Sequence, residues 1–246
     1  MAKIDKTQYS KQEWKKIREQ RRLQKQLSNT SSVEPPQVDF ITGPTKNIGL
    51  EKKRNAFVCG NGKSREPVDL ESLRLYGNIY ACNAVYRTFS PDYLIAVDTK
   101  MILEINKSGY QKKHEVWTNP NKAYTRMQGF NFFNPSKGWS SGPTALWLAS
   151  QHGYETIYIL GFDYRGLEEG TRFNNIYADS ANYKKSTDGA TFFGNWLRQT
   201  KSVIQQHQNI RYVRVIAPDN YCPDELNKFN NFSTITVDTF KKIHGL

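Results

Sequence analysis

Short runs of β-branched and aromatic residues alternate with helix-forming stretches along most of the chain, and this alternation limits its fold more than any other feature. The runs lie at residues 56–59, 79–82, 93–97, 116–118, 157–160 and 213–217. Strands that alternate with helices are typical of a mostly parallel sheet flanked by helices. The sequence therefore predicts an α/β fold, with one domain over residues 36–246.

The segment from Ser141 to Asp163 is the clearest single unit of this pattern. Ser141 can cap a helix that carries apolar residues, and Gly153 can end that helix in the left-handed conformation. A buried strand follows at residues 157–160. A second long helix is predicted over residues 188–206.

The chain before residue 36 has a different character. Ser10 and Glu13 form the pattern of a capping box, which predicts a helix from there to about Leu27. The apolar stripe of this helix is too thin to anchor it to the domain, and the polar segment 28–36, with its Pro pair, predicts a linker. We therefore expect residues 1–35 to form a basic helical arm and a Pro-containing linker.

Half of the net charge of +12 lies in residues 1–28, which hold nine Lys/Arg and three Asp/Glu. Such a basic segment favours an acidic partner, either a nucleic acid, an anionic surface or an acidic protein, and a solvated tail is the alternative. The domain itself shows no nucleic-acid-binding signature, so this prediction concerns the arm alone. The partner-binding side chains predicted in the arm are Trp14, Lys15, Lys16, Arg18, Arg21 and Arg22.

Several other classes of protein are disfavoured. No apolar run reaches the roughly 18 residues of a membrane span, and the start lacks the apolar segment of a secretory signal, so we expect a cytoplasmic protein, or a virion-associated one if the source is a virus. Cys59, Cys82 and Cys222 are odd in number and form no C-x-x-C pair, so reduced cysteines are predicted, the first two in the core. The four histidines show no metal-ligand spacing, and neither a metal nor a cofactor is predicted.

Polar residues gather where the predicted strands end. Gly60 to Ser64, Asn83, Asp98 and Asp163 each follow a strand, and Ser141 opens a helix. Ligands of open parallel sheets bind outside the carboxyl ends of the strands, so we expect these residues to meet at one edge. Each also has a structural interpretation, as a tight turn, a helix cap or a loop tie. An ATPase phosphate loop is disfavoured, because its first glycine would fall at Phe57.

The ordered set of these segments resembles the bacterial sialyltransferases of glycosyltransferase family 42. The segments read FVCGNGKS at 57–64, YACN at 80–83, SSG at 140–142 and GYETIYILGFD at 153–163. The stretch PDYLIAVD at 91–98 is similar to the related MptE-like (6-hydroxymethylpterin diphosphokinase-like) proteins. The resemblance covers about residues 55–220 and implies a Rossmann-like, GT-A-like fold.

The resemblance also implies a pocket for a cytidine nucleotide sugar. Gly60, Asn61, Gly62 and Ser64 would then contact phosphate and ribose, and Asn83 the nucleotide or sugar. The donor carboxylate or base would lie at Ser141 and Gly142, and the cytidine side at Gly161 and Asp163. Gly-rich turns and helix N-termini do favour anions, which agrees with these roles.

Two departures from the family concern the chemistry. Lys63 stands where the family's first loop usually has proline, and residues 183–189 contain no histidine where the family places its general base. A base is needed to take the acceptor proton. The substitutes that the sequence offers are Asp188, which we favour, Asp163 and His152.

Two functions follow. The first is transfer of a sialic-acid-like sugar from a cytidine-linked donor to a hydroxyl acceptor, with weak or absent turnover because the histidine is missing. The second is a non-catalytic docking or structural component of a larger assembly, such as a virion or a homo-oligomer, that keeps the fold and holds its partner through the basic arm.

Overall fold

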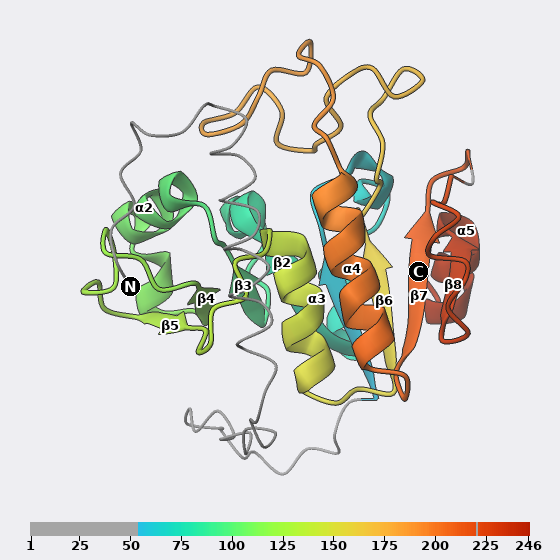
Figure 1. Cartoon of the computed structure of the whole chain (residues 1–246), viewed down its shortest axis with the longest axis horizontal. Helices are drawn as coiled ribbons and strands as arrows, with labels where there is room; N and C mark the ends of the chain where they lie inside the picture. Colours follow the sequence, from blue (N-terminus) through green and yellow to red (C-terminus); the bar gives the residue numbers. More distant parts are fainter. Residues whose placement is uncertain (1–53, 220) are drawn as a thin grey trace, which may run out of the picture. The chain divides into compact units, whose positions relative to one another are not determined.

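The computed structural model describes residues 54–219 and 221–246 (Figure 1). The predicted basic arm, its partner-binding residues 14–22 and the boundary at residue 35 lie outside the described residues and stay predictions. None of the helices in the described ranges is long and apolar enough to cross a membrane.

Eight parallel strands form a single sheet in this part of the chain, which confirms the predicted α/β class. The six predicted runs all form strands, and two further strands, β5 and β8, lie at the edges of the sheet. The strands are β1 (Asn55–Cys59), β2 (Gly77–Cys82), β3 (Tyr93–Ile95), β4 (Val116–Thr118), β5 (Phe130–Phe132), β6 (Thr156–Leu160), β7 (Arg211–Ile216) and β8 (Phe232–Thr236).

The strand order, β5-β4-β3-β2-β1-β6-β7-β8, reverses direction once. From β1 the chain builds outward to β5, then returns to the other side of β1 with β6 and builds outward to β8. The connection after β1 leads to one side of the sheet and the connection after β6 leads to the other, so the carboxyl ends of these two neighbouring strands lie at the switch point of the sheet. This is where open α/β sheets bind ligands.

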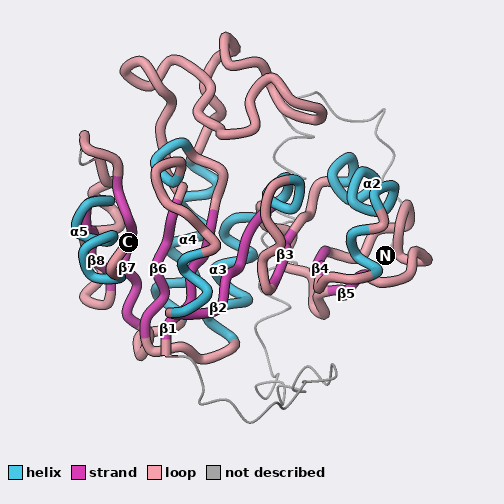
Figure 2. Tube along the Cα trace, turned by 180° about the vertical axis from the view of Figure 1, so that it is seen from behind, coloured by secondary structure: helices cyan, strands magenta, loops and turns pink. Residues whose placement is uncertain are grey.

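Helices cover both faces of the sheet (Figures 1 and 2). The side chains of α3 and α4 share one buried cluster, and those of α2 and α5 share the cluster on the opposite face. The α-helices are α2 (Thr99–Ser108), α3 (Ser141–Gln151), α4 (Gly194–Gln206) and α5 (Val237–His244). Short 3-10 helices occupy Lys63–Arg65, Ser72–Leu75, Asn83–Arg87 and Tyr110–Lys112.

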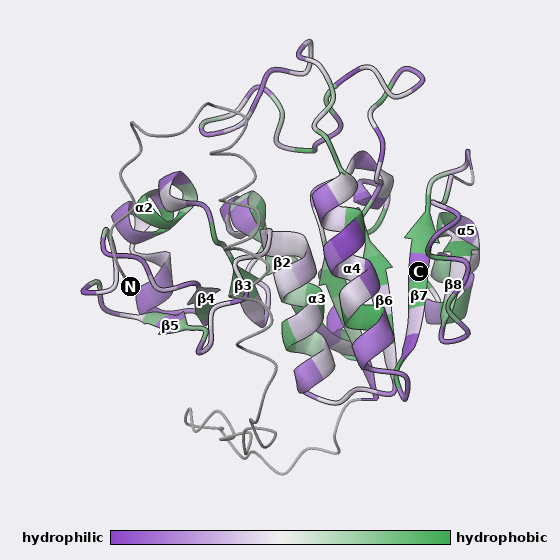
Figure 3. Cartoon of the chain, viewed as in Figure 1, coloured by the Kyte–Doolittle hydropathy of each residue, from purple (hydrophilic) through white to green (hydrophobic). Residues whose placement is uncertain are grey.

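Burial on both faces explains the continuous apolar run of β1. Ala56 and Val58 contribute to the cluster beneath α3 and α4, whereas Phe57 and Cys59 contribute to the opposite cluster. All four are fully buried. Figure 3 shows the same distribution, with hydrophobic strands at the centre and hydrophilic residues on the outer side of α4. Cys59 and Cys82 are buried and unpaired, as predicted.

The predicted helix start at residue 188 is wrong, because α4 begins at Gly194. The backbone before it pairs with another segment: Phe173 N–H donates to Asp188 O, and Ala190 N–H donates to Thr171 O, both at 2.9 Å. Residues 188–190 therefore lie extended against residues 171–173. The predicted left-handed Gly153 is present, with φ +71°, just after α3.

Candidate functional site

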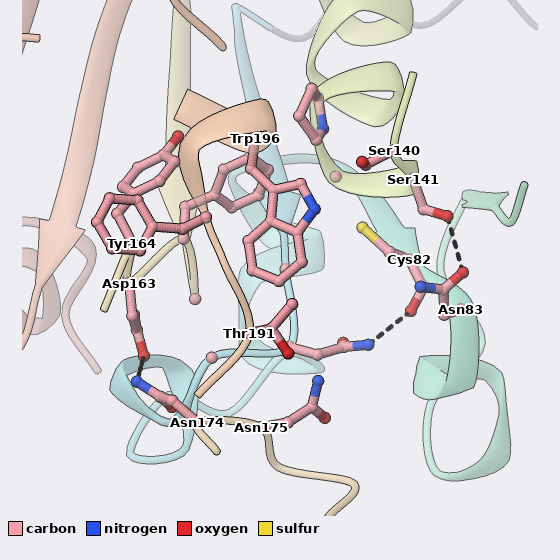
Figure 4. Close-up of a pocket in the computed structure, with 18 of the residues that line it drawn as sticks. Cys82, Asn83, Ser140, Ser141, Asp163, Tyr164, Asn174, Asn175, Thr191 and Trp196 are labelled. Atoms are coloured by element: carbon pink, nitrogen blue, oxygen red, sulfur yellow. Dashed lines mark hydrogen bonds between the residues drawn. The ribbon is translucent and has the colours of Figure 1, made fainter. Parts of the chain in front are cut away.

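A cavity of about 290 Å³ opens at the carboxyl ends of the central strands, where the strand order reverses (Figure 4). Its walls come from the loops after β1, β2, β3 and β6, from the first turn of α3 and from residues 164–196. Ligand pockets are typically about 300–1,000 Å³, so the volume suits a small molecule.

The predicted donor-binding residues gather at this cavity, with one exception. Ser64 does not line it, but its hydroxyl donates to Asp163, which does. The predicted residues that line the cavity are Gly60, Asn61, Gly62, Asn83, Ser141, Gly142, Gly161 and Asp163. Their proximity is established, whereas their binding roles stay predictions.

The Asp163 carboxylate ties three segments together. Its Oδ2 accepts from Ser64 N–H at 3.1 Å and from Asn174 Nδ2 at 3.0 Å, and its Oδ1 accepts from the Ser64 hydroxyl. Three donors thus hold this carboxylate in place. The geometry matches the loop-tie interpretation of Asp163 rather than that of a general base.

The glycines let the loops after β1 and β6 touch. Gly60 N–H donates to Leu160 O at 2.8 Å, and Gly62 N–H donates to Gly161 O at 2.9 Å. A Cβ atom at Gly60 would lie 2.5 Å from Gly161 O, and Gly161 itself has φ +66°. The next amide, Lys63 N–H, donates to Asn174 Oδ1 at 2.9 Å. These amides are therefore already engaged within the protein.

Asn61 lines the cavity and carries a buried acceptor. The residue is only 9% exposed, and its Nδ2 donates to Cys82 O at 3.3 Å and to the Tyr183 hydroxyl at 3.2 Å. Its Oδ1 is buried and has no hydrogen-bond partner among the described residues. A buried polar atom without a partner costs about 1–3 kcal/mol, so this oxygen calls for a donor from a ligand or a water.

Tyr183 contacts Asn61 from outside this cavity, and the sequence reasoning missed it. Its hydroxyl accepts from Asn61 Nδ2 at 3.2 Å and from Ala84 N–H at 3.4 Å. Burial raises the pKa of Tyr183 to about 12, so the hydroxyl keeps its proton at neutral pH. Because the oxygen already accepts twice, that proton is left to donate. Tyr183 lies 122 residues from Asn61, and no sequence pattern joins the two.

Ser141 joins α3 to the sheet and does not cap it, which corrects the prediction from sequence. The N-cap residue of α3 is Ser140, and the Ser141 hydroxyl instead donates to Asn83 Oδ1 at 2.8 Å and accepts from Val97 N–H at 3.1 Å. Asn83 has φ +53°, a left-handed conformation that asparagine tolerates better than most residues. These bonds fix the Asn83 amide at the cavity edge.

Aromatic side chains form a second wall that the sequence reasoning did not identify. Phe162, Phe193 and Trp196 line the cavity, and Trp196 is 37% exposed (Figure 4). Phe162 follows β6, whereas Phe193 and Trp196 lie at the start of α4. Exposed aromatic faces can stack on a base.

The candidate bases lie in different places. Asp188 is exposed and does not line the cavity, and its Oδ2 accepts from Lys185 N–H at 2.9 Å. His152 is at the opposite end of α3 from the cavity and contacts the Tyr80 hydroxyl through Nδ1. No histidine lines the cavity in the described ranges, and no cluster of three metal-ligating side chains occurs in them.

Comparison with known proteins gave one distant likeness. No family model matches the chain, and no curated protein matches it. Among solved structures, the sialyltransferase CstII from Campylobacter jejuni, in complex with the substrate analogue CMP-3FNeuAc, is 14% identical. The alignment covers 65% of this chain and 81% of that chain, with a TM-score of 0.39. The likeness is a distant one and concerns the fold.

Proposed function

We propose that the chain binds a cytidine nucleotide sugar in the cavity between the ends of β1 and β6, and that it is a sialyltransferase-like glycosyltransferase. The observation that carries this proposal is the unpartnered Asn61 Oδ1, which is buried in the wall of the cavity. A ribose hydroxyl or the cytosine amino group would supply the missing donor. The ordered segments that resemble family 42 also support it.

The other walls suit the remaining parts of such a ligand. The first turn of α3, residues 140–143, lines the cavity, and a helix N-terminus attracts phosphate and carboxylate groups. Trp196 and Phe193 offer faces for the base. The Asn83 side-chain amide, oriented by Ser141, would bind the sugar or the nucleotide. Because the amides of Gly60 and Gly62 are engaged, we place the phosphate nearer to α3 than to the first loop.

Nucleotide titration tests the proposal. Cytidine monophosphate at a hundred times its dissociation constant should stabilise the fold by about 2.7 kcal/mol, which corresponds to roughly 5–11 °C in Tm for a chain of this size. Asn61→Ala should reduce that shift. Asn78→Ala is the matched control, because its Nδ2 donates to the Tyr154 hydroxyl at 2.7 Å, near the opposite end of β2.

For each variant, Tm with nucleotide is compared with Tm of the same variant without nucleotide. A substitution that only destabilises the fold lowers both values and leaves this difference unchanged. Wild-type protein that shows no Tm shift with cytidine, uridine, adenosine or guanosine monophosphate would refute nucleotide binding. Equal shifts in Asn61→Ala and Asn78→Ala would show that Asn61 does not contact the ligand.

Two observations favour the second function, a non-catalytic docking body: the first-loop amides are already engaged, and no histidine lines the cavity in the described ranges. In that case the basic arm carries the association. Deletion of residues 1–30 should then abolish binding to an acidic protein or a nucleic acid. With duplex nucleic acid, five phosphate contacts would give a slope of about −4.5 in log affinity against log salt. Unchanged association after the deletion would refute this function.

A further inference from the structure

A second cavity, of about 320 Å³, lies beside the first and shares two wall residues with it. Asn83 and Asp98 line both cavities. The rest of the second wall comes from the first turn of α2 and from residues 182–183. The hydrogen bond between Asn61, in the first wall, and Tyr183, in the second, links the two. The site therefore has two compartments with a common edge.

Asp98 stands on that edge with an unengaged carboxylate. It is the N-cap residue of α2, yet its side chain accepts no capping hydrogen bond. Within residues 54–219 and 221–246 it forms no ion pair either, whereas Asp163 accepts from three donors and Asp188 from one. Asp98 is an exposed residue, so its carboxylate is open to solvent and to a ligand at the rim of both cavities.

The second cavity has the lining of a site for a hydroxylated molecule. Thr99, Lys100 and Asn182 contribute a hydroxyl, an ammonium and an amide, and Tyr183 adds its phenol. Asn182 is held in place because its Nδ2 donates to Glu104 Oε2 at 2.6 Å. Glu104 in turn accepts from Arg87 at 2.7 Å. Neighbours hold Asn182 and Tyr183 in place, whereas Thr99 and Lys100 are exposed. Donors and acceptors of these several kinds suit the hydroxyl groups of a saccharide.

We propose that the second cavity binds the saccharide acceptor and that Asp98 is the general base that takes its proton. This inference rests on the proposed function, since the donor would occupy the first cavity. As the acceptor oxygen attacks the anomeric carbon of the donor sugar, its proton passes to the Asp98 carboxylate. The bond from the anomeric carbon to the phosphate oxygen breaks, and cytidine monophosphate leaves with the electron pair. Asp98 at the shared edge can reach molecules in both compartments.

The test compares Asp98→Asn with Asp238→Asn. Asp238 lies exposed in the first turn of α5, so its variant makes the same chemical change at another helix start. The assay measures the cytidine monophosphate released from a cytidine-linked sialic acid with lactose and N-acetyllactosamine as acceptors. Asp98→Asn should lower kcat by at least about 100-fold with little change in KM, and Asp238→Asn should leave both unchanged. A loss in Asp188→Asn with full activity in Asp98→Asn would overturn the inference.

A second readout does not need turnover. In calorimetric titrations of protein saturated with cytidine monophosphate, lactose or N-acetyllactosamine should bind, and Lys100→Ala and Asn182→Ala should weaken that binding at least tenfold while nucleotide affinity stays the same. Absence of nucleotide binding defeats the proposed function itself. Nucleotide binding with neither turnover nor acceptor binding, or with wild-type turnover in Asp98→Asn, defeats this inference alone.

Discussion

The contact between the loops after β1 and β6 can be tested by adding one methyl group. In Gly60→Ala, the new Cβ would lie 2.5 Å from Gly161 O and 3.1 Å from the Gly161 carbonyl carbon. Both atoms belong to the backbone, so the β6 loop must move away. That movement lengthens the hydrogen bonds from Gly60 N–H to Leu160 O and from Gly62 N–H to Gly161 O.

The expected loss is the sum of two effects. Overpacking a tight contact costs about 1–3 kcal/mol, and two weakened backbone hydrogen bonds cost about 0.5–1.5 kcal/mol each if lost. We expect Gly60→Ala to lower the free energy of unfolding by about 3 kcal/mol, and Tm by roughly 6–12 °C. Urea unfolding followed by circular dichroism, together with a thermal melt, measures both.

Gly189→Ala is the matched control for this experiment. A Cβ at Gly189 meets nothing within 4 Å, and its φ lies outside the left-handed region. This variant should therefore be neutral or stabilising by up to about 1 kcal/mol. If the two variants unfold within about 0.5 kcal/mol of each other, the two loops do not meet as described.

Two further predictions follow from shifted pKa values. Hydrogen bonds from Arg87 lower the pKa of Glu104 from 4.5 to about 2. The contribution of Glu104 to stability is therefore full above pH 4.5 and is lost as pH falls towards 2. Between pH 4.5 and 2, the free energy of unfolding measured in urea should fall less steeply in Glu104→Gln than in the wild type. Burial raises the pKa of Cys59 to about 11 and of Cys82 to about 12. In the folded protein at pH 8, Ellman's reagent should therefore label the half-buried Cys222 first, and simultaneous labelling of all three thiols would contradict this.

The central strands could be predicted from sequence because burial on both faces leaves a continuous apolar run. The edge strands could not. β5 has three residues, one of them exposed, and most of β8 is only partly buried. An edge strand with one solvated side lacks the run that marks a central strand. The start of α4 was missed for another reason, because residues 188–190 pair with residues 171–173, and that pairing overrides local helix preference.

The site residues that directly follow a predicted strand could be placed from the sequence. Parallel strands bring their carboxyl ends to one edge, so the residues that follow β1, β2 and β6 had to meet there once the strands were known. Tyr183 belongs to residues 164–193, a segment between β6 and α4 without such a rule. Single contacts set its path, such as Ile176 N–H to Asn61 O at 2.8 Å and Arg87 to the Ser180 hydroxyl at 2.8 Å. No periodicity in a sequence encodes contacts of this kind.

The polar residues of this edge fall into two groups, those whose side chains have hydrogen-bond partners within the protein and those with an atom that has none. Residue type alone does not separate the two groups. The carboxylate of Asp163 and the hydroxyl of Ser141 have their partners within the protein, so they hold the loops in place. Asn61 Oδ1 is buried without a partner, and the Asp98 carboxylate lies unengaged where two cavities meet. Among the described side-chain atoms that are buried without a partner, Asn61 Oδ1 is the one whose residue lines the cavity, so it is the one that a bound ligand would satisfy. Asp98 follows β3 and Asp163 follows β6, with β2 and β1 between them, so the two lie on one edge of the sheet. Of the two, only Asp98 has a carboxylate without a hydrogen-bond partner in the described ranges.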